Sequence, residues 1–187
     1  SRAYSLSNHV ASLKVIRKRI SSVRSTQQVT KAMKMVAAAK LRRAQERAEH
    51  ARAYSDRLAA VLQRLAGVVG SSGHPFLAPA GDAPPHLIVV TGDRGLCGAY
   101  NSNVVRLAEQ FLSSREGAGA TITACGRRGR DHFRSRGHKL VREHVNLQGD
   151  MGVDLAREIA ADAAQRFVTG EAGKVCLVYT KFRSAIS

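Results

Sequence analysis

The sequence predicts an α/β protein made of a long N-terminal coiled-coil helix followed by a mainly parallel sheet with covering helices. Three observations support this prediction. Residues 11–66 contain neither Gly nor Pro and are rich in Ala, Arg, Lys, Leu, Gln and Met, which favour helix. Short apolar runs then alternate with segments of helical spacing, as in parallel sheets. The apolar fraction of 44% is that of a folded chain.

The first element is a helix expected over residues 11–66, with Ser12 as its N-cap and Gly67 as its stop. About 54 helical residues give a rod of roughly 80 Å. A domain formed by the remaining residues would be only ~30–35 Å across. The helix is therefore expected to project from the domain.

A heptad seam runs along this helix, apolar at both ends and polar or small in the middle. Its positions are Leu13, Ile16, Ile20, Val23, Gln27, Thr30, Lys34, Ala37, Leu41, Ala44, Ala48, Ala51, Ser55, Leu58, Leu62 and Leu65. Such a seam requires a partner helix, and no other segment of this sequence has that length. We expect the partner to be another chain or a continuation beyond Ser187. The alternative is an amphipathic helix that lies on its own domain.

The charge of the chain is concentrated in this helix. Residues 1–66 carry 15 Lys or Arg against three acids, a net charge of +12, whereas residues 67–187 carry 15 against 11, a net charge of +4. No acidic residue precedes Glu46. A basic arm of this kind predicts an acidic partner.

The first ten residues are left out of the fold prediction. They are free of acid and contain Arg and Ser, and Arg2 to Ser5 resembles the site at which mitochondrial presequences are cut. Residues 1–10 are interpreted as a tag or a targeting remnant.

The rest of the chain is interpreted as a linker over residues 67–86 and an α/β globular domain over 87–187, incomplete at its C-terminus. Strands are expected at 87–91, 120–125, 139–145 and 174–180, and helices at 103–113, 127–136 and 153–168. Because strands and helices alternate, the sheet is expected to be mainly parallel and Rossmann-like.

A glycine-rich turn follows the first expected strand. It reads Thr91-Gly92-Asp93-Arg94-Gly95-Leu96-Cys97-Gly98-Ala99-Tyr100-Asn101, with the spacing G-x-x-G-x-x-G. Dinucleotide-binding folds place their phosphate turn here, but with the spacing G-x-G-x-x-G and an acid after the second strand. We prefer a structural turn with a polar network of Asp93 and Arg94. An NADP site using Arg127 and Arg128 is the alternative.

Other chemistry is not indicated. Three cysteines and no C-x-x-C motif suggest buried thiols in a reducing compartment. The seven histidines lack metal-ligand spacing, and no catalytic constellation is visible. We therefore expect a non-catalytic chain with no cofactor and no bound metal.

Two segments together resemble the gamma subunit of F-type ATP synthases. The first, residues 26–42, reads TQQVTKAMKMVAAAKLR and resembles the shaft motif of that family. The second is the signature Asp93, Arg94, Gly95, Leu96, Cys97 and Gly98, followed by Asn101. The resemblance covers residues 11–187, and Tyr179 to Phe182 matches a third, shorter pattern.

The resemblance implies the central-stalk rotor, which couples proton-driven rotation to conformational change at the catalytic beta subunits. Implied partners are the alpha3-beta3 ring, an epsilon-type (or delta/epsilon) stalk subunit and the membrane c-ring. The residues implied to meet the stator are Lys31, Met33, Lys34, Met35 and Arg42. The implied place is peripheral, on an energy-transducing membrane: the mitochondrial inner membrane on its matrix side, the bacterial cytoplasmic side or the plastid stroma.

Two other functions remain as alternatives. A basic coiled-coil nucleic-acid-binding protein would use the acid-free stretch that precedes Glu46. Against it, Lys and Arg are interleaved with the apolar seam, and aromatic residues make up only 5% of the chain. A Rossmann-type NADP-binding enzyme domain would use the glycine-rich turn. The predicted shaft has neither nucleic acid as a partner nor a membrane span of its own.

Overall fold

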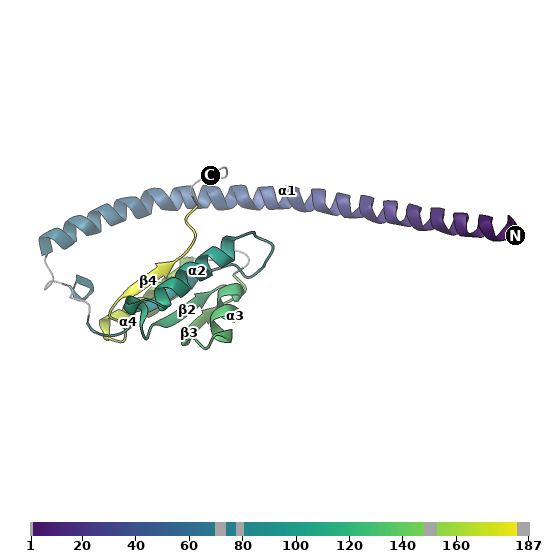
Figure 1. Cartoon of the computed structure of the whole chain (residues 1–187). Coiled ribbons are helices and arrows are strands. Elements are labelled where there is room, and N and C mark those ends of the chain that lie inside the picture. Colours follow the sequence, from purple (N-terminus) through teal and green to yellow (C-terminus); the bar gives the residue numbers. More distant parts are fainter. Residues whose placement is uncertain (1, 70–73, 78–80, 148–152, 183–187) are drawn as a thin grey trace. The chain divides into compact units, whose positions relative to one another are not determined.

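The computed structural model describes residues 2–69, 74–77, 81–147 and 153–182, and the side chains of the first helix from Ser12 to Val68. These residues form two compact units, one ending at Leu62 and the other beginning at Gln63. The first is a single helix and the second contains the sheet (Figure 1).

The helix α1 spans Arg2–Val69, which is 68 residues and longer than predicted. The N-cap expected at Ser12 is wrong, because Ser12 lies within the helix. Gly67 does not stop the helix either, since α1 continues to Val69. Nothing between residues 2 and 11 breaks a helix, and one Gly costs only about 1 kcal/mol relative to Ala. At 1.5 Å per residue, α1 is roughly 100 Å long.

The apolar seam of α1 is exposed to solvent. Its Leu, Ile and Val side chains range from 43% exposed at Leu58 to 67% at Val23. In the middle of the seam, the Thr26 hydroxyl donates to the Ser22 carbonyl (3.0 Å) and the Thr30 hydroxyl to the Thr26 carbonyl (2.7 Å). The Thr30 hydroxyl of the seam is thus satisfied within the helix, while the apolar ends still present a surface that a partner could cover.

The second unit is an α/β domain, which confirms the predicted fold class. Its elements are η1 (Pro75–Leu77), β1 (His86–Val90), α2 (Tyr100–Leu112), η2 (Arg115–Gly117), β2 (Thr121–Cys125), α3 (Arg127–Ser135), β3 (Leu140–His144), α4 (Val153–Val168) and β4 (Val175–Val178). The sheet has the order β3-β2-β1-β4, and every pairing is parallel. The helix predicted to start at residue 103 starts at Tyr100, because the preceding turn leads directly into it.

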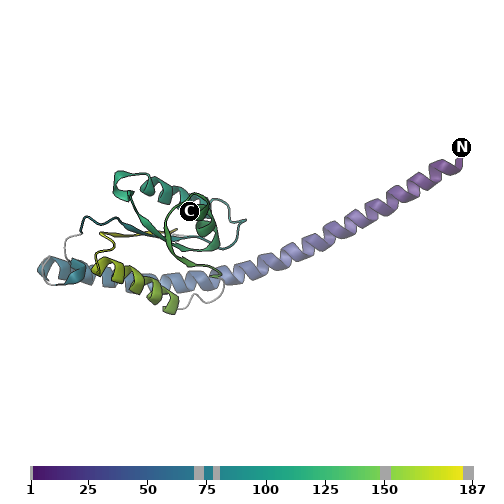
Figure 2. The same cartoon turned by 90° about the horizontal axis from the view of Figure 1, so that it is seen from below.

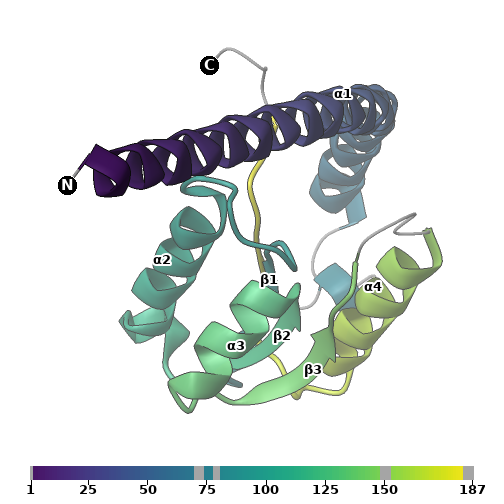
Figure 3. The ribbon, with the colours of Figure 1, turned by 90° about the vertical axis from the view of Figure 1, so that its right-hand side faces the viewer.

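The domain has three layers, with α2 and α3 on one face of the sheet and α4 on the other (Figures 2 and 3). The larger core lies under α2 and α3 and consists of Leu87, Val89, Val104, Ala108, Ile122, Phe133 and Val178. The smaller core lies under α4 and consists of Ile88, Cys125 and Ala163. Alternate residues of β1 serve the two cores, as the period of a strand requires.

A buried histidine joins β1 to β2 on the face covered by α4. His86 is 0% exposed, and its ring nitrogens lie 2.8 Å from the Thr121 hydroxyl and 3.0 Å from the Thr123 hydroxyl. Burial, followed by the nearby Arg166 charge, lowers the pKa of His86, while Asp162 opposes this effect. His86 is therefore a satisfied neutral group that fixes the pairing of the two central strands.

Candidate functional site

The glycine-rich turn lies at the carboxyl edge of the sheet, and Thr91 anchors its start. The Thr91 N–H donates to the Cys125 carbonyl at 2.7 Å, and its hydroxyl donates to the same carbonyl at 3.1 Å. The hydroxyl also accepts from the Gly129 N–H at 2.8 Å. Thr91 is only 3% exposed. One side chain thus ties the end of β1 to the end of β2 and to the first turn of α3.

The Asn101 side chain stabilises the turn through hydrogen bonds to its backbone. Its Oδ1 accepts from the Gly92 N–H at 2.8 Å, and its Nδ2 donates to the Arg94 carbonyl at 3.2 Å. The same Nδ2 lies 3.1 Å from Cys97 Sγ. A residue in the first turn of α2 therefore holds both ends of the turn in place.

Asp93 connects the turn to two distant segments. Its Oδ1 accepts from the Arg127 N–H at 2.9 Å and from the Asn146 N–H at 3.0 Å. Burial alone would raise the pKa of Asp93, but the backbone N–H groups of Arg127, Asn146 and Leu147 and the Arg127 charge together lower it. The carboxylate is held ionised at the N-terminus of α3, where an anion is favourable.

The backbone of the turn explains one of its glycines, Gly98, and reveals a strained residue. Gly98 has a φ of +58°, a conformation that glycine adopts without steric cost. A Cβ on Gly95 would lie 2.6 Å from Arg128 Nη2, so the Arg128 guanidinium packs against the backbone there. Leu96 also has a positive φ, +60°, which is unfavourable for a residue with a side chain. Leu96 is fully exposed.

This geometry favours the structural interpretation of the turn over the NADP alternative. The α3 amide that a phosphate would use is already bonded to Asp93, and the Arg127 side chain donates to Asn146 Oδ1 at 2.7 Å. The predicted network of Asp93 and Arg94 exists in a different form. Arg94 takes part through its carbonyl, and its guanidinium makes no ion pair among the residues that the structure describes.

The predicted stator-contact residues all lie exposed on α1. Met33 is 66% exposed and Met35 is 62% exposed. At about 100° per residue, Met33 and Met35 are roughly 200° apart around the helix, so they face different directions. Arg42 bonds to Glu46 at 3.1 Å in a solvent-exposed pair, and such a pair contributes little to stability. The contacts of these residues, and of Lys31 and Lys34, with a stator stay a prediction.

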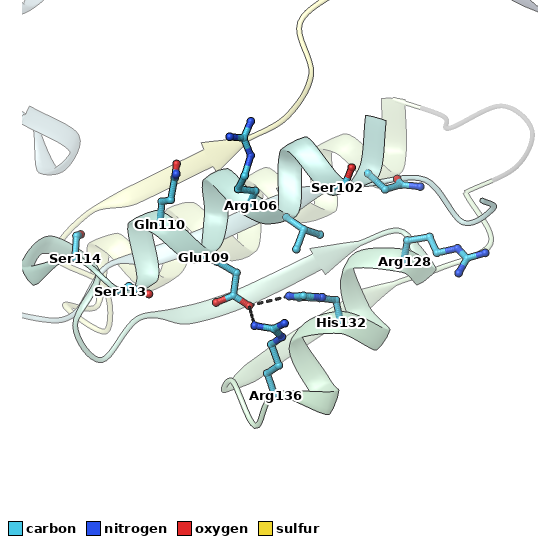
Figure 4. A pocket seen from close by; sticks show the side chains of 11 residues that line it. Ser102, Arg106, Glu109, Gln110, Ser113, Ser114, Arg128, His132 and Arg136 are labelled. Carbon is cyan, nitrogen blue, oxygen red and sulfur yellow. Dashed lines mark hydrogen bonds and ion pairs between the residues drawn. The ribbon is translucent and has the colours of Figure 1, made fainter. Parts of the chain in front are cut away.

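A second polar cluster, not predicted from the sequence, lies in a shallow groove between α2 and α3 (Figure 4). Glu109 Oε1 is 2.8 Å from His132 Nε2 and 3.8 Å from Arg136 Nη1, and Glu109 Oε2 is 3.3 Å from His138 Nε2. Both imidazoles pack edge-on against the buried Phe133 ring. The cluster joins α2, α3 and the segment between α3 and β3. Among the described residues, no group of three or more His, Cys, Asp or Glu is arranged to hold a metal ion.

Sequence reasoning missed Asn146 as well as this cluster. Asn146 follows β3 with a φ of +62°, and Asn is one of the residues that tolerates this conformation. The only signal in the sequence was an Asn after an expected strand, and that signal does not say which carboxylate its N–H will meet.

Comparison with known proteins is consistent with this geometry. A family model described as ATP synthase matches residues 12–187. An ATP synthase gamma chain of Chloroherpeton thalassium is 44% identical over 185 residues, covering 95% of this chain and 60% of the relative. Gamma chains of Chlorobium luteolum and Pelotomaculum thermopropionicum are each 45% identical, covering 94% and 91% of this chain and 62% and 60% of those relatives. The chain thus spans about 60% of the length of the curated relatives it matches.

Proposed function

Because this chain belongs to the family of ATP synthase gamma chains, we propose that it acts in the central-stalk rotor of an F-type ATP synthase. In this role it couples proton-driven rotation to conformational change at the catalytic beta subunits. The observation that carries the proposal is α1, a 68-residue helix whose heptad seam and basic side chains are mostly exposed from Ser12 to Val68. No domain of this size needs so long a helix for its own core.

The surface of α1 suits a shaft that turns inside a ring of other subunits. In the middle of the seam the Thr30 hydroxyl donates to a carbonyl of the same helix, as does that of the neighbouring Thr26. Rotation requires a shaft whose contacts differ from one angular position to the next. Met33 and Met35 face different directions, so each can meet a different stator subunit at a given angle. The net charge of +12 over residues 1–66 suits acidic segments on those subunits.

We propose that the chain itself is not catalytic. The proposal is supported by two amides that a nucleotide phosphate would use: the Gly92 N–H already donates to Asn101, and the Arg127 N–H at the start of α3 already donates to Asp93. The proposed partners are the alpha3-beta3 ring, an epsilon-type stalk subunit and the membrane c-ring. Among the described residues, no helix is both long enough and apolar enough to cross a bilayer. The proposed place, peripheral on an energy-transducing membrane, rests on those partners.

The test is to purify the native complex through a tag on the full-length gene product and to reconstitute it in vesicles. We expect alpha and beta subunits to co-purify, with ATP hydrolysis driving proton uptake. Met33→Lys should leave assembly intact and lower the number of protons pumped per ATP, because it adds a charge at a close rotor–stator contact. Tyr54→Lys, at a side chain 71% exposed on the same helix, is the matched control.

Two results would count against the proposal. Failure of alpha and beta subunits to co-purify would contradict the proposed rotor function itself. Unchanged pumping per ATP in the Met33→Lys complex would leave the function in place and overturn the assignment of Met33 to the rotor–stator contact.

A further inference from the structure

The α/β domain is charged unequally on its two faces. The segment from Arg127 to Lys139, which contains α3, carries six Lys or Arg against one acid, Asp131. The segment from Val153 to Glu171, which contains α4, carries two Arg against four acids. Because α3 and α4 cover opposite faces of the sheet (Figure 3), the side that carries α3 is positive and the side that carries α4 is negative.

Three arginines on the positive side keep most of their charge available to a partner. Arg106 on α2 and Arg128 on α3 are exposed and form no ion pair among the described residues. The Arg136 side chain is 60% exposed, and its Nη1 lies 3.8 Å from Glu109 Oε1, which is longer than a hydrogen bond. Two other arginines of α3 are already paired with acids, Arg130 with Asp131 and Arg134 with Glu143.

Arg106, Arg128 and Arg136 line the shallow groove between α2 and α3, and Glu109 is the only acid among the residues that line it. Figure 4 shows that the three guanidinium groups point in different directions and do not converge on one point. Along the axis of α3, Arg128 and Arg136 are about 12 Å apart. This spacing disfavours a single small anion and fits an array of separate phosphate groups, which guanidinium groups bind well.

A phospholipid membrane and a nucleic acid both present phosphate groups as an array. Single-stranded nucleic acids are also held by aromatic side chains that stack on the bases, but no Phe, Tyr or Trp lines the groove. Under the proposed function, moreover, the domain works beside a membrane. The membrane is therefore the better fit.

We propose that the side of the domain formed by α2 and α3 binds a membrane surface rich in anionic phospholipids, with Arg106, Arg128 and Arg136 facing the headgroup phosphates. The contact is electrostatic, so it acts within about a Debye length of the surface and weakens as salt is added. The proposal rests on the proposed function and adds to it a direct contact with lipid.

The test uses the soluble catalytic complex, purified with the full-length gene product but without the membrane c-ring, so that vesicle binding cannot come through that ring. The isolated chain is unsuitable, because residues 1–66 carry a net charge of +12 and would bind anionic vesicles themselves. Co-sedimentation is measured with vesicles of phosphatidylglycerol and phosphatidylcholine in equal parts and with vesicles of phosphatidylcholine alone. We expect the complex to bind the anionic vesicles about tenfold more tightly or better, and this preference to fall with salt.

Variants of this chain carry the test, because the other subunits have charges of their own. Arg106→Gln/Arg128→Gln/Arg136→Gln should weaken binding to anionic vesicles about tenfold or more. The same three positions changed to Lys keep the charge and should keep the binding. Labelling of the buried Cys125 checks that each variant is folded. If the triple Gln variant opens the domain, Arg106→Gln/Arg128→Gln leaves the Glu109 cluster intact and should weaken binding about fivefold.

A matched control removes the same number of charges elsewhere in the domain. Arg157, Lys174 and Lys181 are exposed and do not line the groove. Arg157→Gln/Lys174→Gln/Lys181→Gln should therefore leave binding to anionic vesicles nearly unchanged.

The outcomes distinguish this proposal from the rotor function. Equal binding to both kinds of vesicle, or binding that the Gln variants leave unchanged, overturns the lipid contact while the rotor function stands. Displacement by glycerol phosphate at matched ionic strength would indicate a site for a single anion, and loss of binding in the Lys variant would indicate a structural role; either result overturns the proposal. Tighter binding of duplex DNA than of vesicles, with the same dependence on the three arginines, would assign this side to nucleic acid instead. Failure of alpha and beta subunits to co-purify with the wild type would contradict the rotor function.

Discussion

Removal of the Asp93 side chain should loosen the whole carboxyl edge of the sheet. In the native chain its Oδ1 accepts from Arg127 at 2.9 Å and from Asn146 at 3.0 Å, which are 34 and 53 residues away in sequence. Asp93→Ala leaves both N–H groups without this acceptor and removes a negative charge from the N-terminus of α3. Asp93→Asn keeps the oxygen but removes the charge.

The size of the effect follows from these contacts. A hydrogen bond to a charged group contributes about 1.5–3 kcal/mol, and loss of a helix cap costs about 0.5–2 kcal/mol. Because the Asp93 carboxylate is half-exposed and both bonds share one oxygen, we expect about 1–2 kcal/mol for Asp93→Ala and about half of that for Asp93→Asn.

The assay uses the buried thiol of Cys125, because α1 dominates any helical signal from the whole chain. Cys125 is 3% exposed, and burial raises its pKa to about 11, so it reacts only when the domain opens. Since 1.4 kcal/mol is a factor of ten, Cys125 labelling at pH 8 should rise about five- to thirtyfold in Asp93→Ala. Asp82→Ala, at an exposed carboxylate before β1, is the control and should change the rate little.

The pH dependence supplies an independent check. The pKa of Asp93 is lower in the folded chain than in the unfolded chain. The contribution of Asp93 to folding stability is therefore present above the ordinary Asp pKa of ~3.9, and it is lost as the pH falls through the pKa of the folded chain. The stability difference between wild type and Asp93→Ala should therefore shrink toward pH 3. A labelling rate within twofold of wild type at pH 8, or a difference independent of pH, would refute the reasoning.

Three other predictions concern separate parts of the molecule. Phe133→Ala should cost about 3–5 kcal/mol in urea unfolding, because Phe133 is 0% exposed in the main core; a cost below 1 kcal/mol would contradict the assigned core. Burial alone would raise the pKa of Glu109, but the His132 hydrogen bond and nearby positive charges lower it. The contribution of Glu109 to folding stability is present above the ordinary Glu pKa of ~4.3 and is lost as the pH falls. Glu109→Gln should therefore flatten the acid side of the curve of stability against pH. An unchanged acid side would argue against the cluster. The isolated chain should show no micromolar binding of ATP or NADPH by calorimetry; binding that Gly95→Val abolishes would revive the nucleotide alternative.

Local patterns determined which segments become helices and strands. The absence of Gly and Pro before Gly67 was sufficient for one long helix, and the alternation of apolar runs and helical spacing was sufficient for a parallel α/β sheet. The helix boundaries at Ser12 and Gly67 were wrong because cap residues only favour a boundary. A cap signal does not end a helix whose neighbours also favour it.

Only the tertiary structure decided which polar groups meet. Parallel crossovers bring the ends of β1, β2 and β3 to one edge, and this places Asp93 beside the N–H groups of Arg127 and Asn146. The same packing brings Glu109 between His132 and His138. Residue spacing cannot reveal such contacts, because they depend on strand order and on the angle at which each helix crosses the sheet. The sequence by itself determined a long basic helix joined to an α/β domain, whereas the conformation of the glycine-rich turn depends on the long-range hydrogen bonds that Asp93 makes with the backbone of distant segments.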